Sequence, residues 1–305
     1  MTVPARVWIP VALVASLIAG TLADRPEPSP VIRIGGYRVL SADFHLHSGL
    51  WSGGTLTPWG LVLEAERQGL DVIALTAHDE TGDARVARAF ARIAGGPVVL
   101  IGEEITSATQ DLIAVHIEST ISSKLPLPQQ IEEVHRQGGL AIAAHPVGRY
   151  GSQYAAVRQA IDGAEVCHPA QWERDDWAAD LERFKASTPA MPIGSSDFHF
   201  MGHPGACRTF IFARDATEPA VLEALRAHRT VVYLPNGHAY GDPELVKLGE
   251  MAGLPQLARA YTRARGSVLD WVSRVLALVA LFGIVVSIRS PASRRAPAGL
   301  ESRLP

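Results

Sequence analysis

Cysteine is scarce in this chain. Cys167 and Cys207 are its two cysteines among 305 residues, which is too few for a small domain held together by disulfides. Neither belongs to a Cys-x-x-Cys pair, and this argues against a structural zinc site with thiolate ligands. Two interpretations stay open: one disulfide in a domain outside the cytoplasm, or two small buried residues.

An excess of charge of one sign is also absent. The formal net charge is −3, so we expect no binding of nucleic acid through bulk electrostatics. The hydrophobic share of 47% excludes a disordered chain, and the length suffices for one large domain or two small ones. No Gly-rich dinucleotide fingerprint and no Gly-x-Ser-x-Gly motif occurs, so the sequence favours neither a nucleotide cofactor nor a serine nucleophile.

Long apolar runs occur near both ends of the chain. The run at 7–23 carries no charge and follows Arg6, a pattern typical of a signal peptide or of a retained signal anchor. The run at 275–288, extended back to residue 268, predicts a transmembrane helix. Arginines follow this second run, so the positive-inside rule predicts a cytoplasmic C-terminus and an extracytoplasmic domain between the two runs.

These features divide the sequence into six segments. They are a signal anchor or signal peptide at 1–24, a Pro-rich linker at 25–36, a folded domain at 37–235, a linker and membrane-proximal segment at 236–267, a transmembrane helix at 268–289 and a polar tail at 290–305. The folded domain is therefore expected at the cell membrane, on its periplasmic or extracellular side.

Within the folded domain, apolar runs of strand length alternate with amphipathic stretches. Residues 56–69 begin with Thr57 and Pro58 and end at Gly69, as a capped helix does, and a strand is predicted next at 71–77. Further strands are predicted at 37–44, 97–103, 111–117, 140–146, 164–169, 191–199 and 207–213, and further helices at 82–94, 126–139, 154–161, 172–186 and 217–228. Repeated strand–helix units predict a mainly parallel sheet closed into a (β/α) barrel.

Potential metal ligands follow most of the predicted strands. They are His45, His47, His78, Asp79, Glu103, Glu104, His116, His145, Asp197 and His199. In a parallel barrel the carboxyl ends of all strands open on one face, so these side chains are expected to meet there. A single histidine beside an apolar run usually has a structural role, whereas this many at equivalent strand ends indicate a metal site. Imidazole and carboxylate without thiolate suit zinc, manganese or iron(II).

The segments "DFHLHS", "LTAHD", "IGEEI", "VHI", "AAHP" and "GSSDFH", in this order, resemble the PHP (polymerase and histidinol phosphatase) family. The resemblance covers roughly residues 38–235. It implies a distorted (β/α)7 TIM-like barrel that holds two or three divalent metal ions (Mn, Zn or Fe). It also implies hydrolysis of phosphate mono- or diesters by a metal-activated water.

The resemblance also implies which residues hold each ion. One ion would be held by His45, His47, Glu104 and Asp197, a second by Glu104, His116 and His145, and a third in part by His78 and His199. The chain departs from the family at Gly53, where an Asp or His is usual, and at Ala77 in "TAH", where Asp is usual. The third ion thus lacks one ligand from the protein and is expected to be absent, loosely held, or completed by Asp79 or water.

Four residues are expected to act in catalysis: Asp197, His199, His168 and Arg208. Arg208 and Arg149 are candidates for contact with a phosphate group, because guanidinium matches phosphate geometry. His168 and His203 are candidates for a general acid, with ordinary hydrogen-bonded loop histidines as the alternative.

The leading hypothesis is a membrane-tethered, metal-dependent phosphoesterase acting on a small phosphorylated substrate or a nucleotide. One alternative is another metal-dependent hydrolase of the amidohydrolase type, although no lysine at a strand end matches the carbamylated bridge of that family. The other alternative is a non-catalytic metal-binding domain, against which the complete ligand sets of the first two sites argue.

Overall fold

The computed structural model describes residues 5–23, 30–49, 52–172, 174–200, 202–261 and 268–289. The chain divides into two compact units, one comprising Pro26–Ala264 and the other comprising Met1–Arg25 together with Arg265–Pro305. The polar tail predicted at 290–305 lies outside the described residues.

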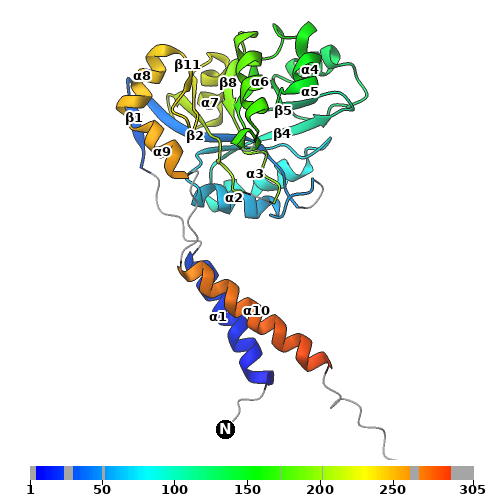
Figure 1. Cartoon of the computed structure of the whole chain (residues 1–305), viewed down its shortest axis with the longest axis vertical. Coiled ribbons are helices and arrows are strands. Elements are labelled where there is room, and N and C mark those ends of the chain that lie inside the picture. Colours follow the sequence, from blue (N-terminus) through cyan, green and yellow to red (C-terminus); the bar gives the residue numbers. More distant parts are fainter. Residues whose placement is uncertain are drawn as a thin grey trace, which may run out of the picture. The chain divides into compact units, whose positions relative to one another are not determined.

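A single curved sheet forms the centre of the larger unit (Figure 1). Its strands follow the order β11 (Ala239–Gly241), β10 (Thr230–Tyr233), β9 (Thr209–Ala213), β2 (Tyr37–Leu46), β3 (Val72–Leu75), β4 (Val98–Thr106), β5 (Asp111–Val115), β6 (Leu140–Ala143), β7 (Gly163–Cys167) and β8 (Met191–Gly194). The short β1 (Ile32–Ile34) pairs with the start of β2. Because β8 also packs against β9 and β10, the sheet is a nearly closed barrel, and the predicted barrel-like α/β fold is confirmed.

The sheet is mixed, and the prediction of a mainly parallel sheet was wrong. Parallel pairing joins β2, β3 and β4, and again β6, β7 and β8. β5 is antiparallel to both of its neighbours, and β9, β10 and β11 also pair in antiparallel fashion. The reason for β5 lies in its connection: residues 107–110 alone join it to β4, too few for the helix that a parallel crossover needs.

Helices cover the outside of the barrel (Figure 1). They are α2 (Pro58–Arg67), α3 (Gly82–Ala94), α4 (Leu127–Arg136), α5 (Gly148–Gln153), α6 (Asp175–Ala186) and α7 (Glu218–Arg226), with 3-10 turns η1 (Tyr154–Ala156) and η2 (Pro169–Trp172). Thr57 caps α2, since its side chain accepts the backbone N–H of Gly60 at 3.1 Å. The helix predicted at 154–161 instead lies earlier, as α5. It ends where the fully buried Tyr154 is anchored, its hydroxyl donating to the carbonyl of Asp111.

Two layers of apolar side chains stabilise the barrel. The inner layer joins side chains from strands around the sheet and from α7: Leu40, Phe44, Ile113, Ile142, Ile193, Ile211 and Val221. The outer layer fills the space between strands and helices, against α2 and α3 on one side and α4 on another. This arrangement leaves the carboxyl ends of the parallel strands free to carry polar side chains.

The folded unit extends beyond residue 235, where a linker was predicted. β11, α8 (Pro243–Met251) and α9 (Leu254–Tyr261) fold onto it. Leu245 and Leu254 are buried with side chains of β9 and β10. Asp242 caps α8 by accepting the backbone N–H of Glu244 at 2.9 Å, so the Asp-Pro pair at 242–243 was a start signal for a helix.

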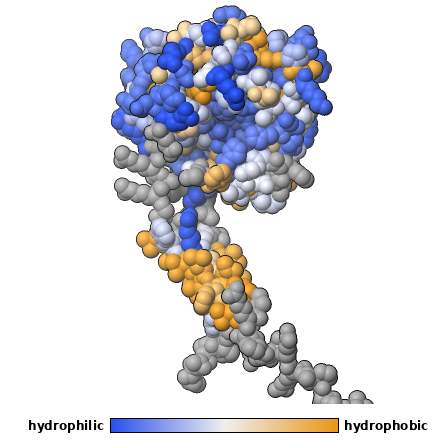
Figure 2. All heavy atoms as spheres, turned by 45° about the vertical axis from the view of Figure 1, so that its right-hand side comes forward, coloured by the Kyte–Doolittle hydropathy of each residue, from blue (hydrophilic) through white to orange (hydrophobic). Residues whose placement is uncertain are grey.

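The second unit consists of α1 (Ala5–Ala23) and α10 (Val268–Arg289), which pack against each other. The hydroxyl groups of Ser16 and Ser273 each donate to the other residue's carbonyl oxygen at 2.8 Å. A Cβ at Gly283 would overlap the Trp8 ring, so glycine permits this close packing. Hydrophobic side chains cover the visible face of the pair (Figure 2).

Both terminal helices predicted from the apolar runs are present, but their role as membrane segments is not supported. Among the described residues, no helix combines the length and the apolar character that crossing a membrane requires. In α10, Arg274 and Arg289 bound the uncharged stretch, which is shorter than the roughly 20 residues of a span. The expected location at the cell membrane is accordingly not supported either.

Candidate metal centre

A bulge in β2 turns two histidines into the barrel. Phe44 packs in the inner apolar layer, whereas Leu46, which would share its face in a regular strand, packs in the outer layer. The pairing of β2 with β3 shifts its register within this stretch. His45 and His47 are consequently fully buried, within 3.3 Å of Glu104.

Four ligand atoms from three strand ends lie close together. Nε2 of His45 lies 3.3 Å from both Oε2 of Glu104 and Oδ1 of Asp197. Nε2 of His47 lies 3.3 Å and 3.2 Å from the same two oxygens. Ligands at about 2.0–2.1 Å from a tetrahedral ion are themselves about 3.3 Å apart. Both Nε2 atoms and Oδ1 of Asp197 are buried and have no hydrogen-bond partner among the described residues, so the group fits a cation.

The other ring nitrogen of each of these histidines has a partner. Nδ1 of His45 lies 2.9 Å from Oε1 of Glu165, and Nδ1 of His47 lies 2.6 Å from Oγ of Ser52. A proton on Nδ1 leaves the lone pair on Nε2, the atom that faces the cluster. Oε2 of Glu165 also accepts the backbone N–H of His145 at 2.5 Å, so one carboxylate orients two histidines.

A second group of ligands shares Glu104. Its Oε1 lies 3.2 Å from Nε2 of His145, and Asp111 joins these two residues. Oδ1 of Asp111 is buried with no hydrogen-bond partner among the described residues. Asp111 is the first residue of β5, and it lies at this edge because β5 is antiparallel to β4.

His116 does not reach this group, although it was expected to hold a metal with Glu104 and His145. It follows the last residue of the antiparallel β5 and lies at the opposite edge of the sheet. Its Nδ1 is 3.2 Å from Oε1 of Glu218, beside a surface hollow of about 740 Å³. Asp111 occupies the place expected for His116.

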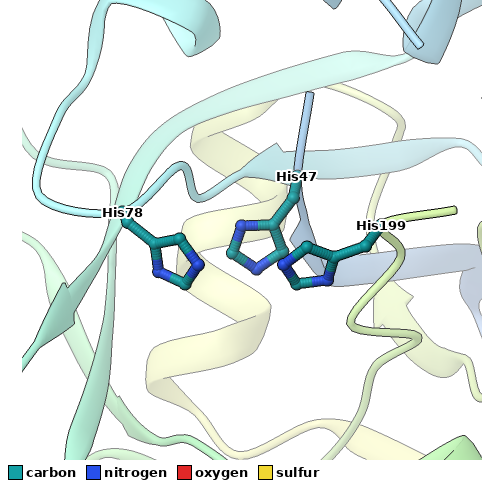
Figure 3. A group of neighbouring side chains, drawn as sticks. All are labelled: His47, His78 and His199. Atoms are coloured by element: carbon teal, nitrogen blue, oxygen red, sulfur yellow. The ribbon is translucent and has the colours of Figure 1, made fainter. Parts of the chain in front are cut away.

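Three imidazoles form a third group, in which the rings of His47, His78 and His199 face one another (Figure 3). The ring of His47 lies 4.0 Å from that of His199 and 4.6 Å from that of His78, measured between centroids. The side chains of His78 and His199 are 40% and 28% exposed, so this side of the centre is open to solvent. Asp79 is absent from the groups found among the described residues, and its Oδ1 accepts the backbone N–H of Thr106 at 3.1 Å.

His168 orients Asp197. Its Nδ1 accepts the backbone N–H of Ala170 at 3.2 Å, which leaves the ring proton on Nε2. This proton points to Oδ2 of Asp197 at 3.2 Å. The contact leaves Oδ1 of Asp197 free for the cluster, so His168 lies beside the centre as predicted but supports a ligand.

Asp43 and Glu165 are buried acidic residues that sequence reasoning missed. Asp43 accepts the backbone N–H groups of His45, Ser196 and Gly205 at 3.2, 3.1 and 2.7 Å, and so joins β2 to the loop that carries Asp197. Asp43 lies within the apolar strand β2 and Glu165 within the apolar strand β7. An acidic residue inside a buried strand was the sequence signal that could have identified them.

Arg208 is not at the cluster, where it was expected to contact phosphate. It is buried, and its guanidinium donates to Oγ of Ser41 at 2.9 Å and to the carbonyl of Gln68 at 3.2 Å. Arg149 is exposed on α5, and the neighbouring Tyr150 ring packs edge-on against His145 at 6.1 Å. Nδ1 of His203 lies 3.0 Å from the carbonyl oxygen of Pro204, within its own loop.

Opposite charges determine the pKa values in the cluster. Burial alone would lower the pKa of His45, but the carboxylates of Glu104, Asp197 and Glu165 raise it well above its usual range. Burial likewise opposes a charged His145, yet the hydrogen bond to Glu104 raises its pKa to about 9. Burial would raise the pKa of Glu104, but His45 and its other imidazole neighbours hold it well below its usual range.

Strained backbone accompanies these strand ends. Asp79, His145 and Asp197 have φ angles of 53°, 24° and 48°, in the left-handed region that residues other than glycine rarely adopt. Such conformations persist where the surrounding structure requires them, and they concentrate at functional sites.

The comparisons with known proteins concern the family and the fold. No protein-family model matches the chain. An uncharacterized protein of Methanocaldococcus jannaschii is 30% identical over 117 residues, which cover 35% of this chain and 68% of that protein. The crystal structure of a two-domain protein from Bacteroides vulgatus, containing a predicted PHP-like metal-dependent phosphoesterase, matches with a TM-score of 0.59 and 25% identity. That match covers 75% of this chain and 74% of the other. An amidohydrolase from Chromobacterium violaceum matches with a TM-score of 0.41 and 17% identity, over 53% of this chain and 88% of its own.

Proposed function

We propose, since the chain belongs to the PHP family of metal-dependent phosphoesterases, that it hydrolyses phosphate esters at the strand-end cluster. One observation carries the proposal: the spacing of 3.2–3.3 Å between the Nε2 atoms of His45 and His47 and the oxygens of Glu104 and Asp197. Burying these imidazoles and carboxylates against one another without a cation costs free energy, because ionisable groups lose their hydration there.

Bound divalent ions would supply Lewis acidity and would lower the pKa of a water molecule for attack on phosphorus. The chain supplies their ligands in two groups that share Glu104, through Oε2 on one side and Oε1 on the other. His45, His47 and Asp197 would hold one ion, and Asp111 and His145 the other. Glu165 and His168 keep the ligands in the required orientation.

The substrate would enter from the exposed side, where His78 and His199 lie. A small phosphorylated molecule or a nucleotide is the substrate class proposed. Arg149 is exposed beside Tyr150 and His145, so its guanidinium is available to a phosphate or to another anionic group of the substrate. Of the two arginines expected to contact phosphate, Arg149 and Arg208, we assign this role to Arg149.

The disulfide between Cys167 and Cys207 supports a location outside the cytoplasm. Disulfides persist in oxidising compartments and are rare in the cytosol. The bond connects the end of β7, next to His168, to the loop between His199 and β9.

The test is hydrolysis of nitrophenyl phosphate mono- and diesters by the purified full chain with Mn²⁺ or Zn²⁺. We expect metal-dependent turnover, and a loss of at least about 10³-fold in Asp197→Asn and His45→Ala. His238→Ala, at an exposed histidine outside the cluster, is the control and should keep full activity. Full activity in Asp197→Asn would contradict the proposal. Metal binding without phosphoester turnover, tested beside a panel of amide substrates, would favour the other hydrolase type or a non-catalytic role.

A further inference from the structure

Four aromatic side chains form a row beside the ligand groups. Tyr150 on α5, His145, His168 and Trp177 on α6 follow one another, with ring centroids 6.1, 5.7 and 5.5 Å apart. The first two contacts are edge to face, and all three distances lie in the range of favourable aromatic pairs. The two inner rings belong to the metal centre, since His145 lies in the second ligand group and His168 orients Asp197. The two outer rings have no part in the function proposed so far.

The outer rings, Tyr150 and Trp177, are not core residues. Each is partly exposed, and neither belongs to any apolar cluster found within the described ranges of the chain. The nearby Tyr154 behaves differently, because it is fully buried and packs its ring against Phe184. Burial in the core therefore does not explain the large aromatic side chains at 150 and 177. Aromatic side chains of this kind commonly line binding sites.

The helices that carry the two outer rings are fixed to each other. The backbone N–H of Gly148, at the start of α5, donates to Oδ2 of Asp180 on α6 at 2.6 Å. The two helices also pack together. Tyr150 and Trp177 are thus held on one rim of the barrel, each next to a histidine of the metal centre.

Each outer ring has a guanidinium over it. Cζ of Arg149 lies 5.2 Å from the centroid of Tyr150, and Cζ of Arg174 lies 5.3 Å from the centroid of Trp177, as in cation–π contacts. Both arginines are exposed, and their positive charge suits an anionic substrate. Nucleobases stack on aromatic side chains and on guanidinium planes because every base has a π-face, and an aryl group has one too. A glycerol or sugar group has no such face.

We propose that Tyr150 and Trp177 form a subsite for a planar aromatic ring, so that the preferred substrate is the phosphate ester of a nucleoside or of an aryl alcohol. This rests on the proposed function and narrows its substrate class. A phosphate held at the ions has the rest of the molecule within reach of the row, because the row starts from His145 and His168. The outer rings contact the part of the substrate that does not react, so they lower KM and leave kcat nearly unchanged.

The experiment compares Trp177→Leu and Tyr150→Leu with the wild-type full chain in Mn²⁺, on adenosine 5′-monophosphate, phenyl phosphate and glycerol phosphate. Loss of a stacking ring should raise KM by about 5- to 150-fold for the two substrates that carry a ring, and should leave KM for glycerol phosphate unchanged. Each substrate is compared with itself, since the leaving groups differ in reactivity. Trp177→Phe keeps a ring and should retain most of the binding. Phe90→Leu, at a partly buried aromatic residue of α3, is the control and should match the wild type.

The manganese content of each variant separates substrate binding from support of the ligands. It should equal that of the wild type in Trp177→Leu and in Tyr150→Leu. Equal effects on all three substrates, or a loss of manganese that accounts for the lost activity, would overturn the inference, because the rings would then only hold His145 and His168. A larger effect with the adenosine ester assigns the row to a nucleobase, and a larger effect with phenyl phosphate assigns it to an aryl group.

Competition in the wild type keeps the test decisive if the variants fail to fold. Adenosine should inhibit hydrolysis of phenyl phosphate competitively, whereas ribose at the same concentration should not. Equal inhibition by the two, or none by adenosine, would overturn the inference. Absence of turnover with every phosphate ester in the metal-loaded wild type would instead contradict the proposed function itself.

Discussion

Oε1 of Glu165 lies 2.9 Å from Nδ1 of His45, and both side chains are fully buried. The contact fixes which nitrogen of His45 faces the cluster, because the proton shared with Glu165 must sit on Nδ1. The other oxygen of Glu165 accepts the backbone N–H of His145 at 2.5 Å. A residue outside both ligand groups thus orients one histidine of each group.

Replacing Glu165 should weaken metal binding without unfolding the chain. We expect Glu165→Gln to lower the affinity for Mn²⁺ by about 10- to 100-fold, since outer partners of metal-bound histidines typically contribute this much. A competition titration with a fluorescent chelator measures the loss. Glu132→Gln, at an exposed glutamate on α4, is the control. Unchanged affinity in Glu165→Gln would show that His45 does not depend on this carboxylate.

His168 is expected to position Asp197 and not to transfer a proton. His168→Gln keeps an N–H donor near Oδ2 of Asp197, so it should retain more metal affinity than His168→Ala. Both variants should keep the shape of the pH–rate profile while kcat falls. If the fall in rate at high pH, which reports loss of the general acid's proton, disappeared in these variants, His168 would be that acid.

Without metal, the stability of the fold should depend on pH through the hydrogen bond between His145 and Glu104. The pKa of His145 is raised from 6.5 to about 9 in the metal-free chain, where burial opposes the charge and the hydrogen bond to Glu104 favours it. A raised pKa stabilises the fold fully below 6.5, and this contribution is lost as the pH rises through 9.

The melting temperature of the chelated protein should therefore fall between about pH 7 and pH 9, with a loss of about 3 kcal/mol at most. His145→Gln should remove the part of this dependence that His145 contributes, while His45, whose pKa is also raised, keeps its own part. Identical pH dependence in the variant and the wild type would contradict the assignment, and scanning calorimetry in the presence of a chelator measures both.

The disulfide should contribute substantially to stability. It closes a loop across a sequence separation of 40 residues, for which the chain-entropy model gives about 4 kcal/mol. The double variant Cys167→Ala, Cys207→Ala should unfold at a lower urea concentration than the wild type. A reducing agent should lower the midpoint of the wild type and leave that of the double variant unchanged. A wild-type midpoint insensitive to reduction would argue that the bond is absent in solution.

The sequence predicted the cluster better than it predicted the sheet. Strand-end positions identified His45 and Asp197 and left Glu103 and Glu104 as alternatives, because apolar runs followed by polar ligands mark the open end of a barrel. The family resemblance favoured Glu104. Strict alternation along β2 would place His45 on the face opposite Phe44, which points away from the inside of the barrel. The bulge that corrects this arises from pairing with β3, which no local pattern in "DFHLHS" reports.

Strand pairing also explains why Asp111, and not His116 as expected, lies beside Glu104. Both residues flank the same apolar run, and only the strand direction decides which end meets Glu104. The short connection at 107–110 was the available signal for an antiparallel hairpin. Arg208 shows a different limit, since its buried partners, Ser41 and the carbonyl of Gln68, are distant in sequence.

The most direct test of the account locates the ions themselves. Anomalous diffraction from crystals of the full chain grown with Mn²⁺ should show two peaks, about 3.5–4 Å apart, on either side of the Glu104 carboxylate. One peak should contact His45, His47 and Asp197, and the other Asp111 and His145. A single peak remote from Glu104, or an ion at His116 in place of Asp111, would contradict the account.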